Sequence, residues 1–486
     1  MAGYQARHFG ATPISIPWGT LYRMRFQHRR WRGPVPISAP RLIPQVIAAV
    51  VIAALVLPTA MLAATPPPLR RPFPAPVTSR TVSVPSSIDS TGQRDASGAL
   101  NRFIESVPDR SIIAFKAGGM YRLDRGLFIS SRHHLVFDGQ GATLRAHGPT
   151  TLIASSPFLL DGGNTDIVIR GFVIQGGNLR TGPDIYHPGE EDAQGIAIYG
   201  GARIEIAGNS ISQTHGDGIY ANEKDTTHSW VDGLWIHDNQ LSRIGRMGVT
   251  FNAVAHGMVE RNRLDQIGMF VFDIEPDTSA QGARGVTFRN NTVGTYGLTP
   301  LYTNWFFASA NYNVAPGAVI VGITISGNRV TGGAASHANT PNAGGLATWI
   351  GRSRVRNVKF LNNTTTKPGR GPVLVFEHVD GLTVSGNVQP LLGGPLARIS
   401  DSTGVVTSDG DPVGILAILA VTILALGIGR VVSRGPTTPP AAGRATASQA
   451  RFPERQFGHR GQLGLAGGER GSRSGRVGFE RRRSGA

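Results

Sequence analysis

The sequence predicts an all-β solenoid in which short strands stack as coils, with a helix capping its N-terminal end. Glycine supplies 64 of the 486 residues and aromatic residues only 7%, a composition that suits a repetitive fold with many tight turns. A short apolar strand followed by a turn residue and Asn also returns at intervals of 20–50 residues, which are typical of solenoids. The chain has no fixed period of about 40 residues and no long alternating strands, which argues against a β-propeller or a sandwich.

The net charge of +17 is concentrated at the two ends of the chain. Residues 1–45 hold seven Arg and no acid, and residues 430–486 hold twelve Arg against three Glu, which leaves 29 basic and 28 acidic residues between them. The folded part is therefore close to neutral, and we expect no nucleic-acid partner, because nucleic-acid-binding domains carry a basic patch. The chain has no Cys, which excludes disulfides, Cys–metal sites and Cys nucleophiles.

The first apolar run, Val46–Ala64, is nineteen residues without a charge and follows the basic segment 1–45. At about 1.5 Å per residue it spans roughly 28 Å, close to the hydrocarbon core of a bilayer. We predict an uncleaved transmembrane signal anchor over 46–64. A cleavable signal peptide is the alternative, although the small-x-small cleavage pattern is poor here. Met24 is an alternative start site.

A second apolar run, Val413–Gly429, predicts a transmembrane helix over 413–432, with a helix capping the end of the core as the alternative. Because the Arg residues lie on the outer side of both runs, the positive-inside rule places both tails in the cytoplasm and everything between them outside. The tail 433–486 is rich in Gly, Arg, Ser and Pro, which predicts a disordered basic segment that can contact anionic lipid.

Residues 65–86 contain seven Pro and are expected to form an extended linker before the solenoid at 87–410. Helical spacing of apolar residues from Ala96 to Val107, with Asp95 before it and Pro108 after it, predicts a capping helix. Alternating residues then predict four short strands. These strands are Ile112–Phe115, Leu127–Ile129, Leu135–Phe137 and Ala142–Arg145.

The run from DSTG at Asp89 through the helix and FKAGGMYRL to FDGQGATL resembles the N-terminal cap and first coils of the pectate lyase-like superfamily of right-handed parallel β-helix (PbH1-repeat) proteins. The resemblance implies a right-handed parallel β-helix and a carbohydrate-related setting, without supplying an activity.

Beyond this region the strand–turn–Asn motif returns eight times, and Asn at one turn of every coil can form an amide ladder along a stack. The eight residues are Asn178, Asn209, Asn239, Asn262, Asn291, Asn328, Asn363 and Asn387.

Three of these segments align on Asn209, Asn239 and Asn262. Ten and twelve residues after each Asn come apolar residues, and polar residues follow each of them. Because strand side chains alternate between faces, the apolar set is expected to face the core and the polar set the solvent. The apolar pairs are Ile219 and Ala221, Val249 and Phe251, and Phe272 and Ile274; the polar pairs are Tyr220 and Asn222, Thr250 and Asn252, and Asp273 and Glu275.

This polar ladder is the candidate active site. Asp273 and Glu275 are the predicted pair of catalytic carboxylates, and Asp217 in the turn HGDG is a third catalytic candidate. Proximity of like charges, including Asp277, is expected to raise at least one carboxyl pKa, as a general acid requires. The alternatives are that these acids keep a sheet face soluble, and that Asp217 only satisfies backbone N–H groups.

Substrate-binding residues are predicted around this acid pair. His215 and Arg246 lie in the same turn region and are expected to orient an anionic sugar. The aromatic loop 296–313, with Tyr302 and Trp305, is expected to stack on sugar rings or else to tuck onto the stack as an apolar patch. The complete predicted binding set is His215, Tyr220, Asn222, Arg246, Asn252, Tyr302 and Trp305.

The loop 179–194 is the only candidate cation site, and no other cofactor is predicted. Its oxygen-rich side chains suit Ca²⁺, but their spacing is irregular. The candidate ligands are Asp184, Glu190, Glu191 and Asp192.

The sequence therefore predicts a membrane-anchored, extracytoplasmic β-helix that engages a polysaccharide or cell-wall glycan. The leading hypothesis is a glycoside hydrolase that uses Asp273 and Glu275. A non-catalytic glycan-binding scaffold is the second hypothesis, and a uronate lyase or epimerase is the third. FDIEPD at 272–277 bears a loose likeness to the Asp-Pro-His stretch of β-helical alginate epimerases, but the His is missing.

Overall fold

The computed structural model describes residues 70–148, 152–224, 226–302, 304–309, 317–334, 344–351 and 354–407. Both predicted membrane segments and the basic tail lie outside these ranges. Among the described residues, no helix is long and apolar enough to cross a membrane.

The described chain is built from three parallel sheets, and each complete turn of the coil adds one strand to each of them in the order A, B, C. The first turn lacks a sheet C strand, and the turn that begins with β30 lacks a sheet B strand. Sheet A comprises β1 (Arg80–Ser83), β3 (Ser111–Ala114), β6 (His133–Asp138), β9 (Thr165–Arg170), β12 (Gly201–Ala207), β15 (Val231–His237), β18 (Ala253–Glu260), β21 (Gly282–Arg289), β24 (Val319–Ser326), β27 (Val355–Leu361), β30 (Val379–Ser385) and β32 (Val406–Thr407).

Sheet B comprises β2 (Thr91–Asp95), β4 (Met120–Leu123), β7 (Thr143–Ala146), β10 (Val173–Gln175), β13 (Ser210–Thr214), β16 (Gln240–Ile244), β19 (Arg263–Ile267), β22 (Thr292–Tyr296), β25 (Arg329–Ala334) and β28 (Thr364–Thr365). Sheet C comprises β5 (Leu127–Ser130), β8 (Phe158–Asp161), β11 (Ile196–Tyr199), β14 (Ile219–Asn222), β17 (Val249–Phe251), β20 (Phe272–Ile274), β23 (Phe307–Ser309), β26 (Thr348–Ile350), β29 (Leu374–Glu377) and β31 (Ala397–Ser400).

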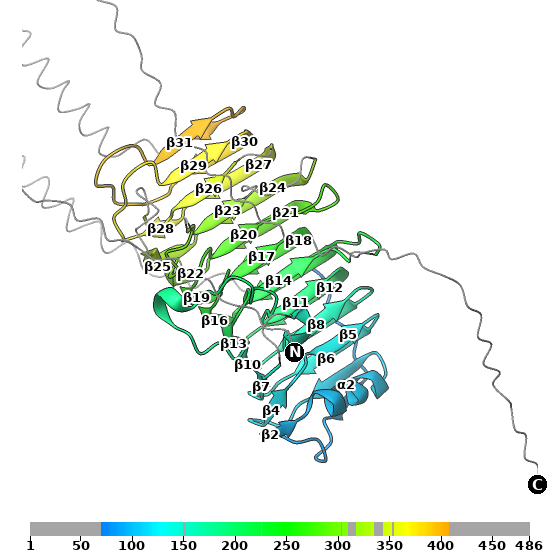
Figure 1. Cartoon of the computed structure of the whole chain (residues 1–486). Helices are drawn as coiled ribbons and strands as arrows, with labels where there is room; N and C mark the ends of the chain where they lie inside the picture. The colour runs from blue at the N-terminus through cyan, green and yellow to red at the C-terminus, as the bar shows by residue number, and fades with distance from the viewer. Residues whose placement is uncertain are drawn as a thin grey trace, which may run out of the picture. The chain divides into compact units, whose positions relative to one another are not determined.

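The strands lie one above another along a single stack (Figure 1). This arrangement confirms the predicted all-β parallel β-helix and fits the pectate lyase-like resemblance. Each of the four short strands predicted near the N-terminus is present, as β3, β5, β6 and β7.

The core runs along the axis of the stack because alternate residues of every strand point inward. Leu234, Ile236 and Phe288, for example, are fully buried in one continuous apolar cluster. Coils approach closely where a Gly precedes a sheet C strand: a Cβ at Gly218 would lie 2.7 Å from the Gly248 carbonyl oxygen. A side chain at this position would separate the coils.

The N-terminal end of the stack is closed by α2 (Ser97–Ser106), which packs against β4 and β5. Its buried residues include Leu100 and Ile104, which confirms the predicted capping helix. The Asp95 carboxylate accepts a hydrogen bond of 2.9 Å from the Ser97 amide at the start of this helix. Two short 3₁₀ segments, η2 (Ile153–Ser155) and η3 (Gly182–Asp184), lie in loops.

An Asn ladder crosses seven coils, and each rung has the same geometry. The Asn262 side chain donates to Ile236 O at 2.9 Å, and both its backbone and side-chain N–H groups donate to the Asn291 carbonyl. Asn178 was predicted to belong to this ladder but does not: its amide donates to Ile185 O and Thr214 O. It follows a sheet B strand, whereas the ladder members follow sheet A. The ladder comprises Asn209, Asn239, Asn262, Asn291, Asn328, Asn363 and Asn387.

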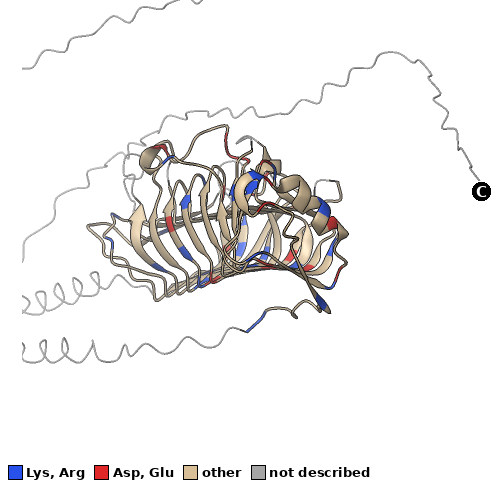
Figure 2. Ribbon diagram, turned by 90° about the horizontal axis from the view of Figure 1, so that it is seen from below, with Lys and Arg blue, Asp and Glu red and all other residues tan. Residues whose placement is uncertain are grey.

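The β-helix begins inside the range predicted as a linker, because β1 pairs with β3. The preceding residues contact the outer face of sheet A. Arg71 forms an ion pair with Glu205 and lies 5.4 Å from the Trp235 ring centroid, and Phe73 contacts the same ring edge-on at 6.4 Å. Basic and acidic residues are interspersed along the stack (Figure 2), as the near-neutral charge of this region predicts.

Candidate functional site

The three aligned segments stack in the register that the sequence predicts. Tyr220 pairs with Thr250, and Thr250 pairs with Asp273, on β14, β17 and β20 of sheet C. The apolar residues on either side of them face the core. The predicted polar ladder therefore exists as a row across three neighbouring strands.

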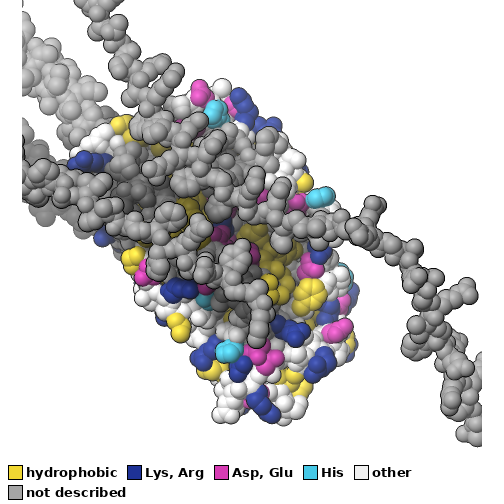
Figure 3. Space-filling view, in the orientation of Figure 1, with side chains coloured by type: hydrophobic (Ala, Val, Ile, Leu, Met, Phe, Trp, Pro, Cys, Tyr) yellow, Lys and Arg dark blue, Asp and Glu magenta, His cyan; other side chains and the backbone are white. Residues whose placement is uncertain are grey.

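The predicted exposure of this row is wrong. Thr250 and Asp273 point away from the core, but both are fully buried. The outer face of sheet C is therefore an enclosed interior at this point. A patch of hydrophobic side chains, with a few acidic ones near it, is visible beside the middle of the stack (Figure 3).

A second apolar cluster closes the site. Across it the rings of Tyr186 and Tyr302 meet edge-to-face at 5.7 Å. Tyr302 and Trp305, predicted to bind sugar, are half-buried packing residues here, which favours the alternative that the aromatic loop tucks onto the stack. The buried members of the cluster are Ile185, Tyr186, Met247, Met269, Phe270 and Ala308.

Arg246 is the centre of the charged site. Its Nη1 lies 3.2 Å from Asp217, its Nη2 lies 2.8 Å from Glu275, and its Nε lies 3.3 Å from Glu191. Burial alone would lower the pKa of Arg246, but the Asp217 and Glu275 carboxylates outweigh it and raise the pKa well above its ordinary value. The guanidinium therefore stays charged and connects two coils and a loop.

Asp217 is fully buried at the turn before β14. Its carboxylate accepts a hydrogen bond of 3.0 Å from the Met247 amide in addition to the contact with Arg246. Burial raises the pKa of Asp217, and Arg246 opposes this shift. The turn is shaped by the next-lower coil, where the Gln194 side chain accepts a hydrogen bond from the Asp217 amide.

Asp273 differs from every other acid of the site. Both of its carboxyl oxygens are buried without a hydrogen-bond partner. Burial, and then the nearby Glu275 carboxylate, raise its pKa well above the ordinary value. Because a buried, unpartnered carboxylate is costly, this environment favours the neutral acid over the carboxylate.

Asp277 continues the row of acids beyond Glu275. Partial desolvation of its carboxyl group and the proximity of Glu275 raise the pKa of Asp277 to about 6, although the residue as a whole is exposed. Asn252 donates a hydrogen bond of 2.8 Å to this carboxylate, while the Asn252 carbonyl oxygen is buried without a partner. The Asn252 side chain therefore has one unpaired hydrogen-bond acceptor beside these acids.

Tyr220 and Asn222 lie at the lower end of the row. The Asn222 amide donates to the Tyr220 hydroxyl at 2.9 Å, and its carbonyl accepts from Gln281 at 2.9 Å. Burial raises the pKa of Tyr220 well above its ordinary value. Tyr220 therefore remains a neutral phenol.

His215 is directed at the covering loop. Its Nδ1 lies 2.8 Å from Glu190, whose carboxylate also accepts a hydrogen bond of 3.1 Å from Arg180. Hydrogen bonding from Arg180, followed by its charge and that of His215, lowers the pKa of Glu190 to about 2 despite partial burial. His215 thus joins the loop to the stack.

The four loop carboxylates predicted for Ca²⁺ are not gathered at one point. Glu190 is held by Arg180 and His215, Glu191 lies against Arg246 and the Tyr186 hydroxyl, and Asp184 and Asp192 are exposed. In the described part of the chain, no three His, Asp or Glu residues are grouped so as to hold a metal ion.

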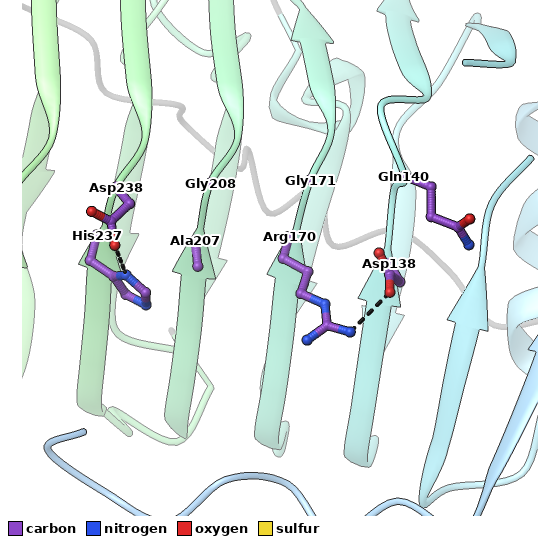
Figure 4. A pocket seen from close by; sticks show the side chains of 8 residues that line it. All are labelled: Asp138, Gln140, Arg170, Gly171, Ala207, Gly208, His237 and Asp238. Atoms are coloured by element: carbon purple, nitrogen blue, oxygen red, sulfur yellow. Dashed lines mark hydrogen bonds and ion pairs between the residues drawn. The ribbon is translucent and has the colours of Figure 1, made fainter. Parts of the chain in front are cut away.

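A shallow hollow elsewhere on the stack involves none of the predicted site residues (Figure 4). It lies where β6, β9, β12 and β15 end. Asp138 forms an ion pair with Arg170 at 2.9 Å, and His237 lies 2.8 Å from Asp238. Its charged groups are thus paired with one another, and the chemistry of the acids lies instead on sheet C.

The sequence did not assign Glu191 and Gln194 to the carboxylate site. Gln194 precedes Gly195 as Asp217 precedes Gly218, and these two coils are hydrogen-bonded through Gly195 N and Asp217 O at 2.9 Å. The repeated X-Gly-apolar pattern therefore carried a signal for Gln194. Glu191 lies on the irregular covering loop, where no periodic pattern places it.

No family model and no curated protein matches the chain. Among solved structures, a Yersinia enterocolitica family 28 exopolygalacturonase is 14% identical with a TM-score of 0.38, covering 68% of this chain and 79% of its own. The DFA-IIIase of Arthrobacter chlorophenolicus A6 without its lid is 13% identical with a TM-score of 0.44, covering 69% and 95%. The catalytic unit of a GH87 α-1,3-glucanase from Streptomyces thermodiastaticus strain HF3-3 is 15% identical with a TM-score of 0.33, covering 70% of each chain.

Proposed function

We propose that this chain hydrolyses glycosidic bonds at the carboxyl groups of sheet C. The observation that carries the proposal is the contrast between Asp273 and Glu275. Asp273 is buried without a hydrogen-bond partner and has a raised pKa, whereas Glu275 lies 2.8 Å from the charged Arg246. A protonated acid beside an ion-paired carboxylate is the pair that glycoside cleavage requires.

The two acids take different roles in this proposal. Asp273 donates its proton to the glycosidic oxygen as the bond to the anomeric carbon breaks. Glu275 acts on the anomeric carbon as a nucleophile, or as the base that takes a proton from the attacking water. Asp217 is a positioning residue, since it holds the Arg246 guanidinium against Glu275.

A lyase or epimerase is less well supported, because both reactions need a base that removes a proton from carbon. Among the predicted site residues, Tyr220 and Arg246 are the side chains that would have to serve as this base, and the pKa of each is raised well above its ordinary value. Neither group is therefore available as a base near neutral pH.

The test is release of reducing ends from a panel of glycans by the wild type and by the Asp273→Asn and Glu275→Gln variants. We expect each variant to lose activity by about 100-fold or more. Asp232→Asn is the matched control, because Asp232 is exposed on sheet A. Full turnover in both site variants would remove the catalytic assignment.

A non-catalytic glycan-binding scaffold is the second candidate, and the complete burial of Asp273 favours it. Binding without turnover by the wild type across the whole panel would decide for the scaffold. An unsaturated product absorbing in the near ultraviolet would instead identify a lyase.

We also propose that the β-helix is displayed outside the cytoplasm on the segments 46–64 and 413–432, with both tails inside. Two charge-free or nearly charge-free apolar runs flanked by Arg support this topology. Protease treatment of intact cells should remove the β-helix and spare the basic tail.

A further inference from the structure

The site is surrounded by more carboxyl groups than cations. Among the described residues its acids are Glu190, Glu191, Asp217, Asp273, Glu275 and Asp277, whereas its basic side chains are Arg180, His187, His215 and Arg246. A ligand that brings its own negative charge to this place would meet net repulsion, and partial burial would strengthen that repulsion.

The basic side chains are also already engaged. Each of the three guanidinium nitrogens of Arg246 faces a protein carboxylate, at 2.8 Å for Glu275, 3.2 Å for Asp217 and 3.3 Å for Glu191. A sugar carboxylate could reach this guanidinium only by displacing one of these groups and leaving it buried and unpaired.

The remaining basic side chains share the Glu190 carboxylate, and His187 lies 3.7 Å from it. Arg180 donates to Glu190 at 3.1 Å, and His215 lies 2.8 Å from the same group. Burial lowers the pKa of His215, although Glu190 opposes the shift. None of these side chains offers an unpaired charge to a ligand, so the predicted role of His215 and Arg246 in orienting an anionic sugar finds no support in these contacts.

The side-chain oxygens of the site that lack a hydrogen-bond partner belong to an amide and to the buried Asp273, and none of them is a cation. The carbonyl oxygen of Asn252 is buried without a partner, and so are both oxygens of Asp273. Sugar hydroxyls can donate hydrogen bonds to these oxygens without adding charge.

From this distribution we infer that the substrate of the site is an uncharged glycan, not a uronate polymer. The inference rests on the proposed hydrolase function and specifies its substrate class. Recognition of a uronate would need a free Arg or Lys that pairs with the sugar carboxylate, and among the described residues the cations of this site are all paired with protein acids.

The test uses chemically matched polymers, polygalacturonate and alginate, each beside its carboxyl-reduced, uncharged product, together with neutral glucans and fructans. We expect kcat/KM to be at least about tenfold higher for uncharged members. Equal or faster cleavage of the uronates would overturn the inference and leave the hydrolase proposal standing.

A binding experiment distinguishes failure of the substrate-class inference from failure of the hydrolase proposal. Asp273→Asn protein is run through native gels containing each polymer. Retardation by uncharged polymers alone supports the substrate class even where no cleavage is found, in which case only the hydrolase proposal falls. Retardation by uronates, or by no polymer at all, overturns the substrate class.

A charge variant tests whether the acids around Arg246 cause the preference for uncharged polymers. Glu191→Gln removes one acid from Arg246 and should narrow the preference for uncharged over uronate polymers by at least about threefold. Glu105→Gln carries the same charge change on the exposed side of α2 and should leave the ratio unchanged. An unchanged ratio in Glu191→Gln would show that charge does not set the preference.

Discussion

The Arg246 guanidinium donates a hydrogen bond of 2.8 Å to the Glu275 carboxylate, which follows β20. The same guanidinium contacts Asp217 at the turn before β14, so one side chain ties the two outer coils of the site together. The placement of the Glu275 carboxylate and the burial of Asp217 thus depend on a residue that does no chemistry itself.

Replacing Arg246 by Gln should destabilise the protein by about 3–5 kcal/mol, because it leaves the Asp217 carboxylate buried without its counter-charge. Urea unfolding at pH 7 measures the change. The double variant with Asp217→Asn should recover a large part of the loss, since it removes the uncompensated charge. Arg263→Gln, at an exposed position of β19, is the control. A double variant as unstable as the single one would contradict the assigned ion pair.

Asp273→Asn should stabilise the fold at neutral pH while it removes activity. The folded pKa of Asp273 lies above its unfolded value, so the folded state binds more protons between the two values. Unfolding free energy therefore falls as pH rises through this window, by up to about 1.4 kcal/mol per pH unit for one group. The loss begins above the unfolded pKa of about 3.9.

The measurement is the midpoint of thermal unfolding from pH 4 to 8 for the wild type, Asp273→Asn and the exposed control Asp232→Asn. We expect the difference between Asp273→Asn and the wild type to grow with pH, whereas the control follows the wild type. Parallel curves for all three proteins would show that Asp273 titrates normally.

The register of the site was predictable from the sequence because strand side chains have a strict period of two. Once Asn209, Asn239 and Asn262 are aligned, the pairing of Thr250 with Asp273 follows, and the structure has this pairing. The inward position of Phe272 follows for the same reason.

The environment of the site was not predictable in the same way. The sequences of the loops beside sheet C have no repeating pattern of apolar residues. The contact between the Tyr186 and Tyr302 rings therefore could not be predicted from the sequence. Glu191 reaches Arg246 across 55 positions of chain. Asn178 carries the strand–turn–Asn motif but follows a sheet B strand. The motif alone therefore does not determine which groups an Asn side chain bonds to; its position in the coil is also needed.

Asn262→Ala should cost about 2–5 kcal/mol of unfolding free energy. Its side chain donates to Ile236 O at 2.9 Å and to Asn291 at 3.1 Å, and it accepts from Asn239 N at 3.0 Å. Removing it leaves several buried polar groups unpaired, at about 1–3 kcal/mol each before relaxation. The control is Gln240→Ala, because Gln240 is an exposed residue of β16 that directly follows Asn239 of the ladder. Urea unfolding compares the two variants. Equal midpoints for the two variants would contradict a stabilising role for the ladder.

Tyr186→Ala should open the cover of the site and leave the β-helix intact. Tyr186 belongs to the small apolar cluster outside the main core and contacts Tyr302 through its ring. Amide hydrogen exchange should therefore accelerate in residues 185–194 and 304–309, while the unfolding midpoint changes little. Water that reaches Asp273 would bring its pKa closer to the ordinary value, because burial is the main cause of its shift.

This change has a kinetic consequence that a merely structural role of Tyr186 would not produce. A general acid loses activity as pH rises through its pKa, so the alkaline limb of kcat/KM should move to lower pH in Tyr186→Ala. Leu179→Ala is the matched control, because Leu179 lies on the same loop with 79% of its surface exposed and should alter neither exchange nor the pH profile. Faster exchange with an unchanged alkaline limb would mean that the cover does not set the pKa of the acid. Unchanged exchange in 304–309 would mean that the two tyrosines do not hold the loops together.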